Sequence, residues 1–252
     1  MVQKSPVIWL RAVKRLRGGG EMKVGMATHV GKVREINEDC IGRKGTLLVL
    51  ADGMGGHQAG EVASALVVER VLALEAEGPD FKEALASVIQ EANHVLLKYA
   101  GEHEECTGMG TTVAVVKVEN GRICVAHVGD SRVYLWRQGV LTQLTEDHTL
   151  VAELVRNGGI TEEQARNHPQ RHILTRALGT PMEVKVEYAE YAIAPGDRVL
   201  LCSDGLTVML SHEEIAALLS AELSPQEIAE QMVQTANEKG GIDNISVIVA
   251  FL

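Results

Sequence analysis

Three short apolar runs in the sequence each lead directly into an aspartate. They are LLVLADG at 47–53, VAHVGDS at 125–131 and VLLCSDG at 199–205, and a fourth run, DNISVIVA at 243–250, begins on an aspartate. Runs of this length, rich in Val, Leu and Ile and bounded by turn residues, are typical of buried β-strands. The acidic residues of these runs therefore fall at strand ends, where one rim of a sheet fold could gather them. They are Asp52, Asp130, Asp204 and Asp243.

The glycine-rich turn after Asp52 leads into a helical pattern, and these are the usual parts of a phosphate-binding loop. A dinucleotide loop needs a third glycine where Gln58 stands, and a nucleoside-triphosphate loop needs a Gly-Lys-Ser/Thr run that the sequence lacks. Asp52 would also place a negative charge where a phosphate should lie. An aspartate that binds a metal ion, which then binds phosphate, avoids this repulsion. Mg²⁺ and Mn²⁺ prefer carboxylate oxygens, and two ions ~4 Å apart can activate water beside a phosphoryl group.

Each Asp-Gly pair also has an ordinary structural interpretation. Asp-Gly is a common hairpin-turn pair, and a single pair is more often just a turn. Composition and spacing therefore leave two interpretations open: a carboxylate metal site, or a set of turns that do not meet.

Val- and Ile-rich runs with short turns predict eight β-strands. They are 24–30, 46–51, 111–118, 122–128, 132–137, 184–192, 198–203 and 244–251. VENGR at 118–122 and RQG at 137–139 are typical of hairpin turns, so we expect residues 111–144 to form an antiparallel meander.

Apolar residues at helical spacing predict helices over 58–76 and 80–100. Two capping-box patterns, one with a first-turn proline, start two further helices before the last strand. They are Ser211 with Glu214, and Ser224 with Glu227 and Pro225. This order of elements predicts an α+β fold with a central antiparallel β-sandwich flanked by helices on both faces.

Residues 147–182 interrupt the strand pattern with a long polar segment. It contains a short helix that Thr161 and Gln164 would cap, followed by RNHPQRH at 166–172. Insertions of this kind usually carry recognition, so we expect this segment to contribute to substrate choice.

The net charge of -10 is unevenly distributed. The first 21 residues carry five basic residues and one acidic residue, whereas the rest of the chain carries 19 basic and 33 acidic residues. An acidic body argues against nucleic acid as the main partner, because a phosphate backbone requires clustered Lys and Arg. It suits a protein that collects divalent cations.

The sequence favours a cytoplasmic protein. No apolar run approaches the ~20 residues of a membrane-spanning helix, so no membrane span is expected. The four cysteines form no C-x-x-C pair. A disulfide framework or zinc site is therefore not expected, and free thiols without a cleavable signal sequence indicate the cytoplasm.

Residues 1–21 are expected to lie outside the fold, with one catalytic domain over 22–252. VIWLRAVKRLR at 7–17 could form a basic amphipathic helix that binds a membrane surface or a partner. We favour the simpler interpretation, an extension upstream of a start at Met22.

Eight further segments occur in a specific order along the chain. They are VREINED, ADGMGGHQAG, GMGTTVAVV, VGDSRVYL, LTEDHTLV, ILTRALG, LLCSDGL and DNISVIV. This order resembles that of bacterial members of the protein phosphatase 2C family, over about residues 23–252. Any one segment is a weak signal, whereas eight in order are highly specific. The resemblance implies a metal-dependent serine/threonine protein phosphatase, with a binuclear Mn²⁺ or Mg²⁺ centre on one edge of a β-sandwich.

The resemblance also implies which residues hold the metal ions. Asp52 would bridge two core ions, and the carbonyl of Gly53 would bind the first. Asp204 and Asp243 would bind the second. Asp130 matches the position that holds a third, weaker ion in bacterial members.

Three other residues would act around the ions. Glu38 and Asp39 would hold waters, and Arg34 would bind the substrate phosphate, a role that suits a planar guanidinium.

One position departs from the pattern of animal members. They carry a histidine, a proposed general acid, directly after the Asp-Gly pair, where this chain has Met54. His57 lies three residues further on, and we expect it to serve at the helix entry or the surface. His148 is expected to be structural or part of a hinge.

Other classes of function are a regulatory phosphatase for one partner, a catalytically dead phosphopeptide-binding module, and an unrelated phosphohydrolase of small molecules. The dead module is disfavoured because every metal aspartate is present. We expect phosphorylated proteins as substrates, a bacterial serine/threonine kinase as counterpart, and a monomer.

Overall fold

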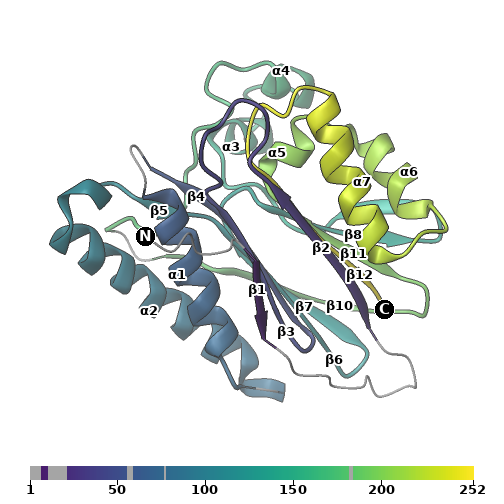
Figure 1. The fold of residues 1–252 in the computed structure, drawn as a ribbon, viewed down its shortest axis with the longest axis horizontal. Helices are drawn as coiled ribbons and strands as arrows, with labels where there is room; N and C mark the ends of the chain where they lie inside the picture. Colours follow the sequence, from purple (N-terminus) through teal and green to yellow (C-terminus); the bar gives the residue numbers. More distant parts are fainter. Residues whose placement is uncertain (1–6, 11–21, 56–58, 77, 182–183) are drawn as a thin grey trace.

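The computed structural model describes residues 7–10, 22–55, 59–76, 78–181 and 184–252, and in it two β-sheets pack face to face (Figure 1). The first sheet has the order β1 (Val7–Leu10), β3 (Asp39–Lys44), β4 (Leu47–Met54), β6 (Val113–Glu119), β7 (Arg122–Val128) and β10 (Glu187–Ala192), with β5 (Gly110–Thr111) beside β4. The second has the order β2 (Lys23–His29), β12 (Ile245–Phe251), β11 (Arg198–Cys202), β8 (Arg132–Arg137) and β9 (Val140–Gln143).

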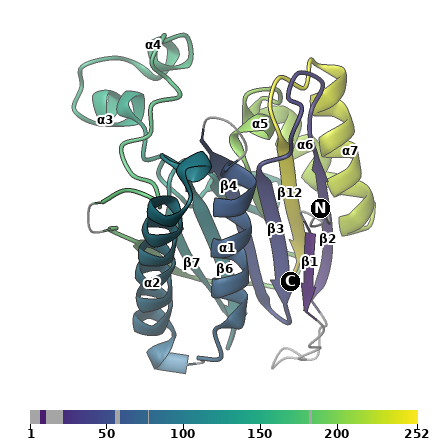
Figure 2. The ribbon, with the colours of Figure 1, turned by 60° about the vertical axis from the view of Figure 1, so that its left-hand side comes forward.

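Helices cover the outer face of each sheet (Figures 1 and 2). The first sheet is covered by α1 (Gly60–Ala73) and α2 (Phe81–Glu102), and the second by α6 (His212–Ser220) and α7 (Pro225–Glu238). The one-turn helix α5 (Asp204–Thr207) follows β11, and two 3-10 turns flank α2, at Gly78–Asp80 and Glu104–Cys106. The predicted α+β sandwich with helices on both faces is thereby confirmed. No helix in the described ranges combines the length and hydropathy needed to cross a bilayer.

Alternation along β4 decides which side chains point between the sheets. Leu48 and Leu50 are fully buried in the layer between the two sheets, whereas Leu47 and Val49 pack against the helices of the first sheet. Successive side chains of a strand point to opposite faces. Asp52 therefore lies on the same face of β4 as Leu48 and Leu50, at the end of the inner layer. We call this edge of the sandwich, where the strand ends carry aspartates, the rim.

The predicted helix starts are confirmed. Ser211 and Ser224 each accept a hydrogen bond from a backbone N–H three residues on, and the partner glutamates complete both capping boxes. Thr161 and Gln164 form a third box at α4 (Glu162–Arg166). These patterns are local, so sequence alone predicts them well.

The prediction of one meander over residues 111–144 is wrong. Its two hairpins, β6–β7 and β8–β9, are present, and Asn120 and Gln138 take positive φ values of 50° and 49° in their turns. The strands β7 and β8, however, belong to different sheets. Between them Gly129, with φ 106°, turns the chain from one sheet to the other, and a Cβ there would lie 2.5 Å from Thr112 Cγ2. Asp130 lies in this crossover.

Three other strand assignments differ from the sequence-based ones. The strand β3 was not predicted, because DCIGRK lacks the Val- and Ile-rich pattern. The strand predicted over 184–192 begins at Glu187. Residues 7–10 pair in parallel with β3, so the helical interpretation is wrong for these four residues. The rest of 1–21 lies outside the described residues, and a domain start at residue 22 stays a prediction.

The segment 147–182 connects β9 of the second sheet to β10 of the first. It contains α3 (Leu150–Arg156) and α4, which stand away from the sandwich at one end of the molecule (Figure 2). No residue of α4 is buried. The segment therefore interrupts the strand pattern as predicted and projects from the same end as the rim that carries Asp130.

Candidate metal centre

Asp39 and Asp52 face each other across neighbouring strands, as register partners of β3 and β4. Asp39 is 1% exposed, and its Oδ2 accepts a hydrogen bond of 2.8 Å from the Oγ of Ser203, which directly follows β11 of the second sheet. Its other oxygen, Oδ1, is buried without a hydrogen-bond partner. A buried carboxylate oxygen without a donor is unfavourable, and a cation is the kind of partner it lacks.

Buried serine and threonine side chains lie next to the rim and hydrogen-bond to the backbone that carries it. Thr112 Oγ1 accepts a 3.0 Å hydrogen bond from the backbone N–H of Asp52 and lies 2.7 Å from Ser131 Oγ. Ser203 Oγ likewise accepts from the N–H of Ser246 at 3.0 Å. Each of these residues lies on the same face of its strand as the apolar side chains that point between the sheets. The alternation of side chains along a strand could therefore have identified them from the sequence.

The other three aspartates reach the same rim from separate connections. Asp130 comes from the crossover between β7 and β8, Asp204 is the first residue of α5, and Asp243 lies just before β12. The charges of all three raise the pKa of Asp52, so they lie within electrostatic reach of it. The fold thus brings together strand ends that lie far apart in the sequence.

Burial and mutual repulsion raise the pKa of the rim carboxyls. Burial is the larger cause throughout. It raises the pKa of Asp39 to about 7, with Asp204 and Asp243 adding to the effect. The pKa of Asp130 rises to about 8 and that of Asp204 to about 6. The pKa of Asp52 lies well above its ordinary value, because the charges of the other rim aspartates act on a buried group.

This donor set fits hard divalent cations. The side chains offer only oxygen, which Mg²⁺ and Mn²⁺ prefer, and a cation would replace the repulsion among them by attraction. In the described part of the chain, no three rim carboxylates bring ligand oxygens within 4.8 Å of one another. An ion held at the rim would therefore complete its ligand set with water or backbone oxygens.

Glu38 and Gly53 connect the rim to the start of α1. Gly53 N–H donates to the carbonyl of Glu38 at 3.1 Å, and Gly60 N–H donates to Glu38 Oε1 at 3.2 Å. A Cβ on Gly53 would lie 2.1 Å from the carbonyl oxygen of Gly60, so only glycine fits this close approach. Burial, and then the charge of Glu61, raise the pKa of Glu38.

Arg34 lies at the exposed edge of the rim. Its Nη2 donates to Asp243 Oδ2 at 2.9 Å, and half of its side chain is exposed. The loop that carries it is fixed by Asn244, whose Nδ2 donates to the carbonyls of Val30 and Ile36 at 2.9 Å each. This half-exposed guanidinium is accessible to an anion from solvent.

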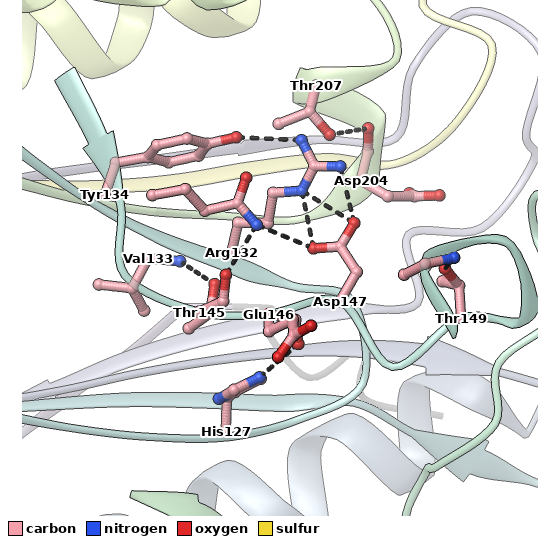
Figure 3. Close-up of polar contacts among 12 residues, drawn as sticks. His127, Arg132, Val133, Tyr134, Thr145, Glu146, Asp147, Thr149, Asp204 and Thr207 are labelled. Carbon is pink, nitrogen blue, oxygen red and sulfur yellow. Dashed lines mark hydrogen bonds and ion pairs between the residues drawn. The ribbon is translucent and has the colours of Figure 1, made fainter. Parts of the chain in front are cut away.

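An ion pair between Arg132 and Asp147 lies next to the rim (Figure 3). Arg132 also donates to Tyr134 Oη at 3.0 Å. Burial and the charge of Asp243 raise the pKa of Asp204, and the charge of Arg132 partly offsets this rise. Neither Arg132 nor Asp147 stands out in the sequence as a candidate functional residue. The pair links the start of β8 to the start of the segment 147–182.

His127, His148 and Glu187 bring ligand atoms within 4.8 Å of one another and form a second group to consider as a metal site. The backbone N–H of Gly129 donates to His148 Nδ1 at 3.0 Å, so Nδ1 carries no proton. The proton of the neutral ring is then on Nε2, which lies 3.0 Å from Glu187 Oε1 and donates to it. A protonated Nε2 cannot bind a cation, so this group is a hydrogen-bonded link. His148 has the structural role predicted for it.

Met54 ends β4, and its side chain packs against Gly110 of β5. A thioether has no proton to donate, so this position supplies no general acid. His57 lies outside the described residues.

The comparisons with known proteins agree with this geometry. A family model described as "Protein phosphatase 2C" matches residues 33–245. A "Putative protein phosphatase 2C-type" of Streptococcus pyogenes is 41% identical over 237 residues, covering 90% of this chain and 96% of the relative. The crystal structure of the serine/threonine phosphatase PstP of Mycobacterium tuberculosis has a TM-score of 0.87 at 40% identity, covering 92% of this chain and 98% of that one. A PstP catalytic domain in complex with two manganese ions has a TM-score of 0.84 at 37% identity, covering 91% and 97%.

Proposed function

Because the chain belongs to the protein phosphatase 2C family, we propose that its acidic rim holds two core ions, Mn²⁺ or Mg²⁺, for the hydrolysis of phosphoserine and phosphothreonine in proteins. The chain is a protein-serine/threonine phosphatase, a phosphoric monoester hydrolase. The observation that carries the proposal is the meeting of carboxylates from both sheets at one rim, with raised pKa values and an unpartnered oxygen on the buried Asp39.

The proposed ligands are those that the resemblance to the family implies. Asp52 would hold both core ions, and the Gly53 carbonyl would hold the first. Asp204 and Asp243 would hold the second. Asp52 and Asp204 are half-buried and their pKa values are raised, which supports these roles, because a carboxylate partly removed from water favours a positive partner.

The ions, when bound, supply Lewis-acid chemistry that makes water nucleophilic near neutral pH and offsets charge on the phosphoryl group. The residues of the chain orient the reactants. Arg34, half exposed beside Asp243, binds the phosphate, and its fork of donors fixes the direction of the scissile bond. Glu38 and Asp39 orient water at the rim. None of these steps needs a covalent intermediate on the protein.

We assign Asp130 to a third, weaker ion. It lies apart from the core strands, in the crossover between β7 and β8. Its pKa is raised to about 8, first by burial and then by Asp204 and Asp147. A cation that touches Asp130 would relieve this repulsion.

Three finer points belong to the same proposal. We place the protein in the cytoplasm, which its four free cysteines support, because a reducing compartment keeps thiols unpaired. We propose that it acts as a monomer. Its substrates would be proteins phosphorylated by a serine/threonine kinase, the reaction that this activity reverses.

The test compares a phosphothreonine peptide with a nucleotide as substrates. EDTA should abolish hydrolysis of the peptide, Mn²⁺ should restore it, and the nucleotide should be a poor substrate. Asp52→Asn should nearly eliminate peptide hydrolysis, whereas Asp80→Asn, at an exposed aspartate before α2, should retain it. Full activity in a metal-depleted preparation, or preference for the nucleotide, would overturn the proposal.

A further inference from the structure

Six large apolar side chains are exposed in the part of the chain that the structure describes, and four of them flank the acidic rim. We call these four the rim patch. They are Val33, Ile36, Val208 and Ile242. Val33 is 65% exposed and Ile242 43% exposed, and each is the immediate neighbour of a rim residue, Arg34 or Asp243. Scattered apolar residues on a surface are ordinary, but a group beside a reactive site indicates a contact surface.

The loops that carry the rim patch are joined to each other. The β2–β3 loop and the loop before β12 lie side by side at one end of the molecule (Figures 1 and 2). Lys32 N–H donates to the carbonyl of Gly241 at 2.7 Å, and Asn244 ties its own loop to the carbonyl of Ile36 at 2.9 Å. The patch is therefore held in place before any substrate arrives.

The helix α5, which leads to the fourth member of the patch, packs against the loop before β12. A Cβ on Gly205 would lie 2.0 Å from the carbonyl oxygen of Asn244, and a Cβ on Gly240 would lie 3.6 Å from Met209 Sδ. Val208 directly follows α5 and is 39% exposed. The patch thus spans the outer edge of the rim from the Arg34 loop to the end of α5.

We infer that the rim patch is the subsite for the residues that flank the phosphoserine or phosphothreonine of the substrate, and that it favours an aliphatic side chain there. This rests on the proposed function, in which the phosphate meets Arg34. Consecutive Cα atoms are 3.8 Å apart, so residues next to the phosphorylated one must pass over the neighbours of Arg34. Those neighbours include Val33 and Ile36. An aliphatic side chain at this subsite removes apolar surface from water on both partners.

The chain offers a matched control for this inference. Val140, on the edge strand β9, is 64% exposed, nearly the same as Val33, but belongs to the far edge of the second sheet. Replacing either valine by serine removes the same exposed surface. Only the change at Val33 alters the rim patch.

The experiment uses two phosphothreonine peptides that differ only in the residue after the phosphothreonine, valine in one and serine in the other. A small aryl phosphate, which has no flanking residues, serves as a third substrate. Wild-type protein should show a KM for the valine peptide about three- to tenfold lower than for the serine peptide. Val33→Ser and Ile242→Ser should reduce that ratio towards one, Val33→Ile should keep it, and Val140→Ser should leave it unchanged.

The outcomes separate this inference from the proposed function. Equal KM values of the wild-type protein for the two peptides, with both hydrolysed, would overturn the inference and leave the phosphatase proposal standing. Failure to hydrolyse either peptide would overturn the proposal itself. An equal effect of Val140→Ser and Val33→Ser would also overturn the inference, as would concentration-dependent dimerisation that Val33→Ser abolishes. The wild-type comparison needs no variant, so it decides even if a variant does not fold.

Discussion

The guanidinium of Arg132 holds both carboxylate oxygens of Asp147, with Nε 2.9 Å from Oδ1 and Nη2 2.7 Å from Oδ2 (Figure 3). The two side chains are 29% and 17% exposed, so the pair is partly shielded from water. It ties the beginning of the projecting segment 147–182 to the second sheet, beside the acidic rim. A forked pair of this kind fixes direction as well as distance.

This pair predicts strong coupling between the two positions. Lysine at 132 provides a point charge that cannot span both oxygens, so Arg132→Lys should lower the free energy of unfolding by about 1–3 kcal/mol. A double-mutant cycle with Asp147→Asn, measured by urea denaturation, should show a coupling energy of the same size. Effects that add within about 0.5 kcal/mol would mean that the two side chains do not depend on each other.

The raised pKa values predict the pH dependence of the metal-free protein. An unfolded aspartate has a pKa of about 4, whereas the folded values are about 6, 7 and 8 for Asp204, Asp39 and Asp130. Between these limits the folded state binds more protons than the unfolded state. The free energy of unfolding should therefore fall as pH rises from about 4 to about 8.

Urea denaturation in EDTA at several pH values measures this slope. Asp52→Asn, which removes one repelling charge, should make the slope smaller. Saturating Mn²⁺ should flatten or reverse it, because the ions stabilise the ionised carboxylates and their binding releases protons. A metal-free protein that becomes more stable through this pH window contradicts the assignment of the rim.

Arg34 should affect substrate use more than folding. Its ion pair with Asp243 is largely exposed, so Arg34→Ala should change the free energy of unfolding by less than about 1 kcal/mol. The KM for phosphopeptides should rise at least tenfold, and Arg34→Lys should restore only part of the loss. Arg122→Ala is the control, since Arg122 forms a similarly exposed pair with Glu190 on the first sheet. A loss of stability that matches the loss of activity would make Arg34 a structural residue.

Asp130 should differ from the core aspartates. Asp52→Ala should nearly eliminate activity and at least one tightly bound ion, because it removes the proposed bridge. Asp130→Ala should keep two tight ions, lower turnover on phosphopeptides and raise the Mn²⁺ concentration that is needed. Calorimetric titration of Mn²⁺ into wild type and Asp130→Ala tests this. Identical isotherms with unchanged phosphopeptide kinetics would mean that Asp130 only stabilises the turn before β8.

The segment 147–182 should contribute to substrate choice. It projects beside the rim, and its run RNHPQRH at 166–172 is largely exposed. Replacing that run with a Gly- and Ser-rich one should alter the ranking of phosphopeptides more than the rate on a small aryl phosphate, which does not reach the segment. Steady-state kinetics on a peptide panel measures both. Equal losses on the two substrate types would argue against recognition by this segment.

The sequence by itself determined the elements that depend on near neighbours. The capping boxes at Ser211 and Ser224 formed as predicted, because their hydrogen bonds join residues three apart. The apolar run before Asp52 became β4, and its alternation set the side of the sheet on which Asp52 lies. Eight ordered motifs indicated the family, which the comparisons confirmed.

Only the tertiary structure decided which strand ends meet. Nothing local distinguishes β7 and β8 as neighbours in one sheet from strands in opposite sheets, because pairing depends on how two apolar faces pack over the whole molecule. Gly129 turns the chain between the sheets and so places Asp130 at the rim. The same packing sets Ser203 against Asp39, 164 residues away, and leaves one oxygen of Asp39 without a donor. The sequence supplies the carboxylates, and the packing of two sheets brings their charges close enough to raise one another's pKa.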